Sequence, residues 1–191
     1  MLAKSYLFCR SPRWKTHNFE LAHQLPTDLQ SWLYEPGSLT KRLRGIYGRD
    51  FGVKVLYQRW QPAFIDECRL LGVRPGAFQL IREVLLYAHQ QPLILARTVL
   101  PTATIKIAQR NLSHLGNRPL GEVIFAYPDL ERRRHQLSNA ETGLWSAAVK
   151  SELQPPAEIW GRRTLYAIHK QPLLVAEFFL PGGVYPAKPG P

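Results

Sequence analysis

The 191-residue sequence has no apolar run as long as the roughly 20 residues that a membrane-spanning helix needs. Its N-terminus is interrupted by Arg10 and Arg13 and lacks the apolar core of a secretory signal. The two cysteines, Cys9 and Cys68, cannot form a disulfide framework and do not have the spacing of metal ligands. These absences predict a reduced, cytoplasmic protein without stable membrane insertion.

The sequence also lacks the short motifs of several enzyme and binding classes. It contains no HExxH zinc motif, nucleophile elbow, P-loop or GxGxxG. Neither an RNP-type aromatic motif nor zinc-finger spacing or a helix-turn-helix supports nucleic-acid binding. The histidines are scattered, at positions 17, 23, 89, 114, 135 and 169. We therefore expect no metal site, no Ser-His triad and no nucleic-acid partner.

What the sequence has in excess is positive charge, with 25 Lys and Arg against 14 Asp and Glu and a net charge of +11. Such a balance suits nucleic acid, an anionic membrane surface or a small anionic ligand. The arginines are spread along the chain. One cluster, Glu131-Arg-Arg-Arg-His135, resembles a phosphate-binding patch in isolation, but such a run is more often a solvated strand or loop face. Composition alone leaves a small anionic ligand open.

Apolar periodicity and turn residues predict helices and strands in mixed order. The predicted helices are 18–34, 39–44 between an N-cap at Ser38 and a stop at Gly45, 64–71, 104–115 ended by Gly116, a short one from Pro119, and part of 138–153. The predicted strands are 53–58, 78–88, 93–100, 130–137, 163–169 and 173–180. Because no βαβ rhythm is present, we expect an α+β fold with a single antiparallel sheet. Residues 1–181 are predicted to form one domain, and 182–191 a Pro/Gly-rich frayed tail.

Two of the predicted hairpins resemble each other. Their second strands read QPLILARTVLP (91–101) and QPLLVAEFFLP (171–181), which share Gln-Pro-Leu, Ala and Leu-Pro. An internal duplication would explain the likeness, although two apolar strands can also resemble each other by chance. Either origin predicts paired antiparallel strands.

Three strands each place one charged side chain among apolar neighbours on a face, namely Arg82, Arg97 and Glu177. An ionised carboxylate alone in an apolar interior is too costly, so Glu177 must be paired, protonated or bound to a ligand. In one interpretation, Arg82 binds a ligand carboxylate through its planar fork, and Glu177 meets a hydroxyl or acts as a base. In the other, Arg97 and Glu177, which occupy equivalent hairpin positions, form a structural ion pair. Residue types alone leave both open.

Six blocks of sequence resemble, in the same order, those of the chorismate pyruvate-lyase family. They are SLTKR (38–42), LIREVLL (80–86), ARTVLP (96–101), RPLG (118–121), WGRR (160–163) and PLLVAEFFLP (172–181). The resemblance implies an antiparallel sheet with a ligand enclosed under helical flaps. It also implies conversion of chorismate to 4-hydroxybenzoate and pyruvate, for the head group of a quinone such as ubiquinone or plastoquinone. The family needs neither a metal nor an organic cofactor.

By this resemblance, Arg82 matches the arginine that binds the ring carboxylate, and Glu177 matches the carboxylate that contacts the ring hydroxyl. These two are the expected catalytic residues. Leu39, a residue of the lid, and Leu120 are expected substrate contacts. The C4 proton would pass either to Glu177 as general base or directly to the enolpyruvyl methylene in a cyclic transition state.

Two features are less well defined by the family pattern. Arg162 or Arg163 is a candidate contact for the second carboxylate of chorismate. Between Leu137 and Trp160 this chain inserts a helix-like segment, so the local sheet pairing and one wall of the pocket do not follow from the resemblance.

Alternative functions belong to other classes. Sensor domains of GntR-type transcription regulators share this general fold, so a non-catalytic domain that binds a small aromatic acid is one alternative. The segment before the first predicted strand is too short for the winged-helix domain that such regulators carry. A nucleic-acid binder that uses Arg132 to Arg134 is another. We expect a monomer with a small-molecule substrate.

Overall fold

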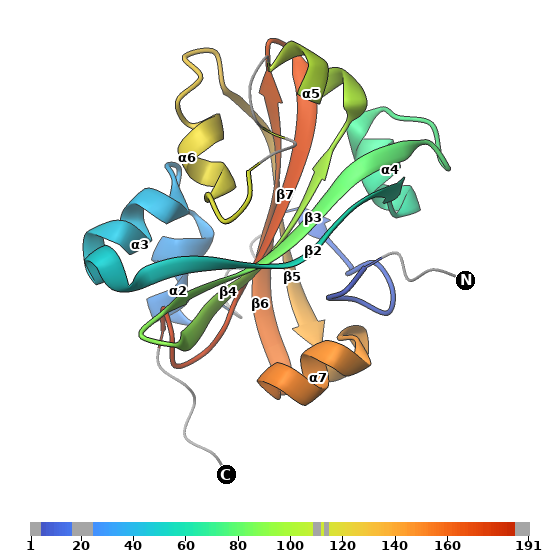
Figure 1. The fold of residues 1–191 in the computed structure, drawn as a ribbon. Coiled ribbons are helices and arrows are strands. Elements are labelled where there is room, and N and C mark those ends of the chain that lie inside the picture. The colour runs from blue at the N-terminus through green and yellow to red at the C-terminus, as the bar shows by residue number, and fades with distance from the viewer. Residues whose placement is uncertain (1–4, 17–24, 109–111, 113–114, 186–191) are drawn as a thin grey trace.

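The computed structural model describes residues 5–16, 25–108, 112 and 115–185 (Figure 1). Part of the helix predicted over 18–34 lies outside the described residues, as does most of the stretch 109–115. Within the described part, the chain forms one antiparallel sheet with helices against it. The predicted α+β class with a single antiparallel sheet is confirmed.

The sheet has seven strands within the described residues, in the order β1-β5-β6-β7-β4-β3-β2. They are β1 (Lys15–Thr16), β2 (Phe51–Pro62), β3 (Phe78–Ala88), β4 (Gln91–Leu100), β5 (Glu131–Glu141), β6 (Glu158–Ile168) and β7 (Gln171–Phe179). All pairs are antiparallel. The two similar hairpins lie side by side in the middle, where β4 pairs with β7.

Both central hairpins use the same turn. His89 and Gln90 have φ of 48° and 65°, and His169 and Lys170 have the same values. Two-residue loops with positive φ at both positions match the right-handed twist of the flanking strands. The local likeness of the two sequences therefore extends to the turn geometry.

A β-bulge makes the two hairpins differ beyond the turn. Leu86 opposes Ile94 while Tyr87 opposes Pro92, so Leu93 is an extra residue in β4; the β6–β7 register has no such shift. One extra residue turns every later side chain to the other face of the sheet. Ala96, and not Arg97, therefore lies beside Glu177.

The sheet thus has two faces that carry different charges. The Arg82 face carries Arg82, Ala96 and Glu177, and the Arg97 face carries Arg97 and its register partner Glu83. The alternative interpretation, an ion pair between Arg97 and Glu177, is wrong, because the bulge places these residues on opposite faces.

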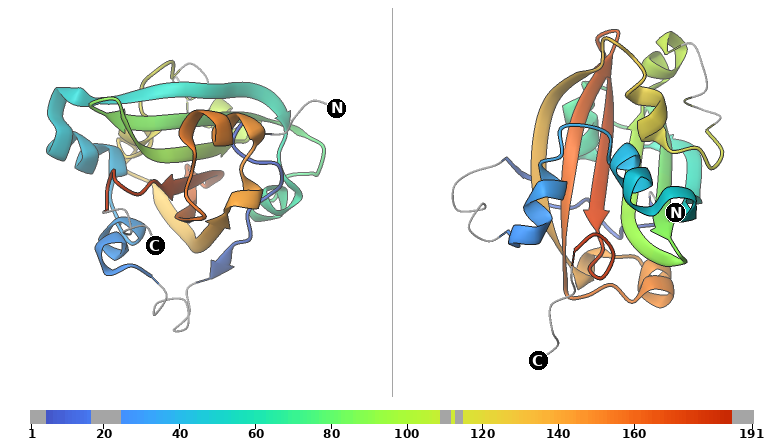
Figure 2. Two further views of the ribbon diagram at one scale, coloured as in Figure 1. Left: turned by 90° about the horizontal axis from the view of Figure 1, so that it is seen from below. Right: turned by 90° about the vertical axis from the view of Figure 1, so that its left-hand side faces the viewer.

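Helices cover both faces (Figures 1 and 2). The helices are α2 (Thr27–Leu33), α3 (Leu39–Tyr47), α4 (Ile65–Leu71), α5 (Thr102–Ile107), α6 (Leu120–Ile124) and α7 (Ala147–Leu153), with 3-10 turns at Gly48–Asp50 and Thr142–Leu144. Side chains of α2, α3 and α6 pack on the Arg82 face, and those of α4 and α7 on the Arg97 face. Within the described residues, no helix is long and apolar enough to span a membrane.

Several helix ends differ from the prediction. Ser38 caps α3 as expected, since its Oγ accepts from the backbone N–H of Lys41 at 3.3 Å. Gly45 does not stop this helix, which continues to Tyr47 and ends at Gly48 with φ 56°. An internal glycine costs only about 1 kcal/mol, and the buried Leu39 and Leu43 hold the helix on the sheet. The helix predicted from 104 is α5, which ends at Ile107, so Gly116 is not its stop.

The segment that departs from the family pattern lies away from the Arg82 face. Strand β5 runs to Glu141, beyond the predicted 137, and pairs there with Glu158 of β6. Helix α7 begins only at Ala147, capped by Ser146, and its Val149 packs with Trp145 on the Arg97 face. The insertion therefore extends the sheet pairing and covers the face opposite to Arg82.

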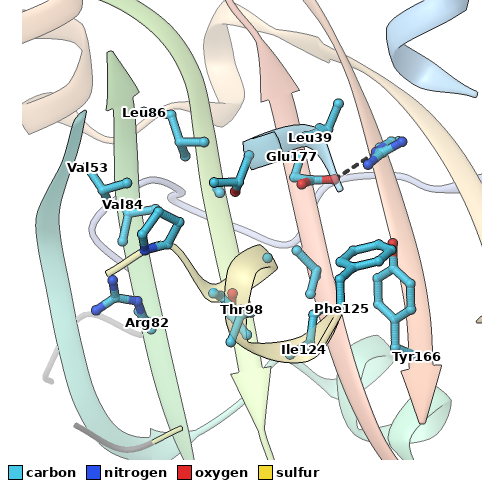
Figure 3. A pocket seen from close by; sticks show the side chains of 17 residues that line it. Leu39, Val53, Arg82, Val84, Leu86, Thr98, Ile124, Phe125, Tyr166 and Glu177 are labelled. Atoms are coloured by element: carbon cyan, nitrogen blue, oxygen red, sulfur yellow. Dashed lines mark hydrogen bonds and ion pairs between the residues drawn. The ribbon is translucent and has the colours of Figure 1, made fainter. Parts of the chain in front are cut away.

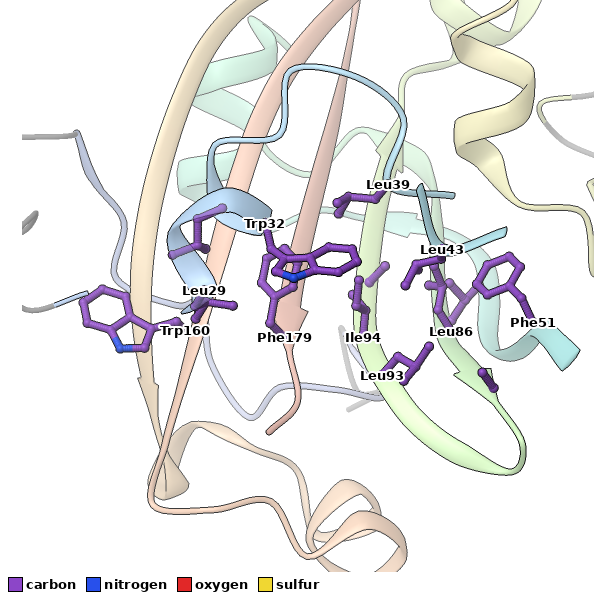
Figure 4. Close-up of a cluster of buried hydrophobic side chains, with 14 of the residues drawn as sticks. Leu29, Trp32, Leu39, Leu43, Phe51, Leu86, Leu93, Ile94, Trp160 and Phe179 are labelled. Atoms are coloured by element: carbon purple, nitrogen blue, oxygen red, sulfur yellow. The ribbon is translucent and has the colours of Figure 1, made fainter. Parts of the chain in front are cut away.

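The largest apolar cluster lies under α2 and α3 (Figure 4). Trp32 and Leu43 cover Ile94 and Phe179 of the central strands. Val184 and Tyr185 also pack against this cluster, and the N–H of Gly182 donates to the carbonyl of Tyr185 at 2.8 Å. Residues 182–185 are therefore not part of a frayed tail, while 186–191 lie outside the described residues.

Candidate active site

A cavity lies between the Arg82 face of the sheet and helices α3 and α6 (Figure 3). Centres of water molecules can occupy about 50 Å³ of it. One water needs roughly 10–15 Å³ in this measure, so the space as it stands holds a few waters. Most of the wall is apolar, and the polar lining side chains are Thr40, Arg82, Thr98, Arg162, Tyr166 and Glu177.

Arg82 supplies the positive charge at one end of the cavity. Its side chain is 2% exposed, and burial lowers its pKa. One Nη donates to Oε1 of Gln58 at 2.9 Å, and the other to the carbonyl of Arg118 at 3.2 Å. No carboxylate among the described residues pairs with it. A buried guanidinium with only neutral partners retains N–H donors for an anionic ligand.

Glu177 lies across the cavity, on β7. Its Oε2 accepts from Nε of the buried Arg162 at 2.7 Å (Figure 3). Within the described part of the chain, the structure records no partner for Oε1. The carboxylate is therefore held in place through one oxygen, and the other can accept a hydrogen bond from a ligand hydroxyl. Arg82 and Glu177 line one cavity from separate strands, as the alternation of side chains predicts.

Arg162 connects this carboxylate to helix α2. One Nη donates to the carbonyls of Trp32, Leu33 and Glu35 at 3.2, 3.4 and 2.8 Å. Carbonyls at the end of a helix have no partners within the helix and favour a nearby cation. The guanidinium is thus fixed by α2 on one side and by Glu177 on the other, and the structure records no partner for its second Nη within the described residues.

Arg163 does not line the cavity. It is on the Arg97 face, where it donates to Asp66 at 2.5 Å and to Gln136, and it lies over the ring of Trp14 at 4.7 Å. Successive side chains of a strand point to opposite faces, so Arg162 and Arg163 cannot both reach the ligand. Of the two candidates for a second carboxylate contact, the structure is compatible with Arg162 and not with Arg163.

The lid over the cavity consists of α3 and α6. Leu39 and Leu120 both line the cavity from these helices, where the sequence placed substrate contacts. A Cβ on Gly121 would lie 2.8 Å from Oγ1 of Thr40 and 3.0 Å from Oγ of Ser38, so the two helices can approach this closely only with glycine. On the outer side, Arg44 of α3 forms an ion pair with Glu122 of α6.

Sequence reasoning missed three polar side chains of the cavity, Thr40, Thr98 and Tyr166. Tyr166 is 4% exposed and lies edge-on to Phe125, the residue that follows α6, with ring centroids 5.9 Å apart. Burial raises its pKa, and the charge of Glu177 adds to this rise. Alternation places Thr98 and Tyr166 on the cavity face. Thr98 lies two positions after Ala96 on β4, and Tyr166 lies four positions after Arg162 on β6. The predicted strand began at Arg163, which left Arg162 and its face out of the comparison.

The Arg97 face holds a separate network of buried charges. Arg97 donates to Glu67 at 2.7 and 2.9 Å and to Glu83 at 2.6 Å. Glu83 also accepts from the hydroxyl of Ser5 and from the N–H groups of Tyr6 and Leu7. This network therefore fastens the N-terminal segment to the sheet, away from the cavity.

Taken together, the cavity has a guanidinium at one end and a guanidinium–carboxylate pair at the other. No group of three or more potential metal-ligating side chains occurs among the described residues. Such a chamber can bind and orient a small ring that carries an anionic group and a hydroxyl.

Comparison with known proteins identifies the family. The sequence profile described as chorismate lyase matches residues 14–188. The chain belongs to the chorismate lyase family. The probable chorismate pyruvate-lyase of Methylococcus capsulatus is 48% identical over 153 residues, which cover 80% of this chain and 94% of that protein. The probable chorismate pyruvate-lyases of Pseudomonas putida and Aromatoleum aromaticum are 38% and 39% identical, over 83% of this chain and 85% and 87% of theirs.

Solved structures show that the fold is shared more widely. PhnF from Mycobacterium smegmatis superposes with a TM-score of 0.57 at 17% identity, over 75% of this chain and 64% of that one. A GntR-family transcriptional regulator from Bacillus cereus gives a TM-score of 0.53 at 15% identity, over 69% and 92%. Likeness at this level concerns the fold alone. The resemblance of six sequence blocks to the chorismate lyase family is confirmed.

Proposed function

We propose that this protein is a chorismate pyruvate-lyase that converts chorismate to 4-hydroxybenzoate and pyruvate. One observation carries the proposal: Arg82, without a carboxylate partner among the described residues, and the Arg162–Glu177 pair line one mostly apolar cavity beneath α3 and α6. The proposed product would supply the head group of a quinone such as ubiquinone or plastoquinone. We expect a cytoplasmic monomer.

In this proposal, Arg82 binds the ring carboxylate. Two of its contacts, to Gln58 and to the carbonyl of Arg118, hold the plane of the guanidinium. The remaining N–H donors match the two oxygens of a carboxylate. Removal of water from the cavity strengthens this contact. The ring is thereby oriented with its carboxylate at the Arg82 end.

The opposite end of the substrate then meets Glu177 and Arg162. Oε1 of Glu177 accepts a hydrogen bond from the ring hydroxyl, while Oε2 stays on Arg162. The second Nη of Arg162 is available for the enolpyruvyl carboxylate. Both carboxylates of the dianionic substrate then have a guanidinium, and the ring is fixed at both ends.

The reaction breaks the bond between C3 and the ether oxygen and removes the hydrogen at C4, which makes the ring aromatic. The ether oxygen becomes the keto oxygen of pyruvate, and the proton ends on the methylene carbon, which becomes a methyl group. The sum is 4-hydroxybenzoate and pyruvate with no other reactant. Aromatisation supplies the driving force, so the protein mainly has to orient the substrate and stabilise developing charge.

Two routes for the C4 proton fit these atoms. Glu177 could carry it to the methylene carbon, or it could pass directly within the substrate. We favour the direct route, because Glu177 is the only carboxylate among the described lining residues and Arg162 already occupies one of its oxygens. Glu177 then holds the hydroxyl and stabilises charge without taking the proton.

The test is direct. Purified protein is mixed with chorismate, and 4-hydroxybenzoate is followed by absorbance and pyruvate by a coupled assay. Equal amounts of both products are expected, without added metal or cofactor. The fold is also that of the ligand-binding domain of a GntR-family transcriptional regulator, so tight binding of chorismate or 4-hydroxybenzoate without turnover would favour a non-catalytic sensor of aromatic acids instead.

A further inference from the structure

An exposed apolar patch lies at the outer corner between β2 and β3. We define the β2–β3 corner as residues 58–78, which include the end of β2, helix α4 and the start of β3. Trp60, Ile65 and Phe78 are 46%, 57% and 61% exposed there. In the register, Trp60 opposes Leu80 and Pro62 opposes Phe78. Trp60 and Phe78 are therefore diagonal neighbours on one face, within contact range for aromatic side chains.

The two aromatic side chains together expose more apolar area than a single scattered apolar side chain does. Aromatic side chains carry roughly 150–250 Å² each, so Trp60 and Phe78, each about half exposed, present roughly 200 Å² together. Ile65, at the start of α4, adds to the same corner. A contiguous apolar patch of a few hundred Å² on a monomer often marks an interaction site.

The surroundings of the patch are cationic. Arg59, Arg69 and Arg74 are exposed in the same corner, and no carboxylate pairs with any of them among the described residues. The two acidic residues of the corner point elsewhere: Asp66 binds Ser11 and Arg163, and Glu67 binds Arg97.

We propose that the β2–β3 corner docks the protein on an anionic lipid bilayer. Trp and Phe side chains favour the interface between headgroups and acyl chains, and arginines favour anionic headgroups. The end of β2, α4 and the start of β3 lie at an outer corner of the molecule (Figure 1), which suits a flat surface. A single-stranded nucleic acid instead requires a basic groove lined with stacking side chains.

Within the corner, Trp60 and Phe78 are on the same face of the sheet as the cavity, whereas α4, which carries Ile65 and Arg69, packs on the opposite face. Gln58, which accepts from Arg82, lies two positions before Trp60 on β2. Docking at this corner would therefore bring the Arg82 end of the cavity towards the lipid. This orientation matters for the proposed lyase, whose aromatic product would be released close to the bilayer, but the lipid binding itself does not depend on catalysis.

The experiment is co-sedimentation of the full chain with vesicles of phosphatidylcholine alone or with about 30% phosphatidylglycerol, at about 0.05 M and 0.5 M salt. Binding is expected only with phosphatidylglycerol and low salt. Quenching of tryptophan fluorescence by lipids with brominated acyl chains should accompany it and should disappear in Trp60→Phe. Absence of binding to anionic vesicles at low salt would overturn the proposal.

Matched variants separate the contribution of this corner to lipid binding from the contribution of the net charge. Changing Arg59, Arg69 and Arg74 to Gln should weaken binding about fivefold for each arginine. The control triple variant changes Arg132, Arg133 and Arg134 on β5 to Gln and loses the same charge. Equal loss in the two triple variants would mean that net charge alone drives binding, and would sink the proposal.

A second matched pair tests the apolar part. Ile65 and Ile46 are both 57% exposed, and Ile46 lies on α3, outside the corner. Ile65→Ala should weaken vesicle binding about fivefold, and Ile46→Ala less than twofold. Melting temperatures check that all variants fold. Self-association through this corner in sedimentation velocity without lipid, lost in Ile65→Ala, would assign the patch to a second copy instead. If the unmodified protein binds lipid but does not convert chorismate, that result would contradict the proposed function and not the docking surface.

Discussion

Arg82 is buried in the cavity, and desolvation lowers its pKa. A ligand carboxylate would accept hydrogen bonds from its remaining N–H donors and so offset the cost of burying the charge. A hydrogen bond to a charged group contributes about 1.5–3 kcal/mol. Arg82→Ala should therefore raise KM for chorismate by about tenfold to a hundredfold and lower kcat as well, as measured by steady-state kinetics. Arg82→Lys keeps the charge without the planar fork, so its KM and kcat should lie between those of the unmodified protein and those of Arg82→Ala. Kinetics like those of the unmodified protein would remove Arg82 from substrate binding.

Glu177 tests the route of the proton. In Glu177→Gln the amide oxygen can still accept from the ring hydroxyl or from Arg162, but the side chain cannot act as a base. If the proton passes directly within the substrate, kcat should fall by about tenfold, the cost of weaker hydrogen bonds and a less compensated Arg162. A loss beyond about a thousandfold would instead show that Glu177 takes the proton. Single-turnover measurements separate this effect from slow product release.

Arg97 carries a prediction about stability. It neutralises two buried carboxylates, Glu67 and Glu83. Removing one partner of a buried ionic group typically costs about 3–5 kcal/mol, so Arg97→Met should lower the free energy of unfolding in urea by about that amount. Because the network is on the face opposite to the cavity, the folded fraction should keep its kcat. Arg133→Met, which breaks the exposed pair with Glu131, is the control and should change stability by less than about 1 kcal/mol.

Helices α3 and α6 meet over the cavity, and their contact governs access to it. The Arg44–Glu122 ion pair joins them on the outside, with side chains 49% and 33% exposed. Arg44→Glu should speed dissociation of bound 4-hydroxybenzoate about threefold to tenfold, because attraction becomes repulsion at a partly exposed pair. Stopped-flow displacement measures this rate, which matters where product release limits turnover.

The charge swap decides whether the pair itself acts. Arg44→Glu combined with Glu122→Arg should restore slow dissociation, whereas each single variant releases faster. At about 0.5 M salt the differences should shrink, since partly exposed charges are screened. Additive effects of the two substitutions would show that each helix responds independently and that the pair does not hold the lid.

The strands that could be predicted are those determined by neighbours in sequence. Strand β3 has the predicted bounds, and the turns at His89 and His169 lie where polar residues interrupt apolar runs. The bulge at Leu93 could not be predicted, because nothing in its sequence distinguishes it from Leu173 in the regular hairpin. Because of this one extra residue, Arg97 lies on the face opposite to Glu177, the partner that equivalent hairpin positions suggested.

The candidate site shows the same limit. Alternation along single strands was enough to place Arg82 and Glu177 on strand faces, and the structure brings them to one cavity. The bond from Arg162 to the end of α2, and the burial of Ser5 against Glu83, join residues far apart in sequence. Such contacts depend on how elements pack, so local patterns could not reveal them.

Across the whole molecule, the two faces of the sheet have different roles. The Arg82 face and its lid enclose the cavity, while the Arg97 face carries a buried ionic network and the N-terminal segment. Residues 182–185, the C-terminal turn, lie against the apolar cluster beneath α2 and α3, where Tyr185 packs. Both ends of the described chain are thus fastened to the sheet, and both carry a tyrosine that responds to alkaline pH.

Burial raises the pKa of Tyr185 to about 12. The pKa of Tyr6 also rises to about 12, through burial and then through its hydrogen bond to Glu152 and the charge of that carboxylate. Tyrosine in an unfolded chain titrates near pH 10. Between these values the unfolded chain has lost protons that the folded protein keeps, so the folded state binds more protons and stability falls as pH rises.

The melting temperature should therefore fall steeply from about pH 10 to about pH 12, beyond any change seen between pH 8 and 9. Phenylalanine cannot ionise, so Tyr185→Phe removes one of the contributing groups and its melting temperature should fall less steeply over the same window. Tyr6→Phe should act in the same direction. Thermal denaturation of the three proteins at each pH measures the slopes. Parallel slopes for Tyr185→Phe and the unmodified protein would mean that the Tyr185 phenol ionises alike in the folded and unfolded chains, and that the C-terminal turn does not shield it from water.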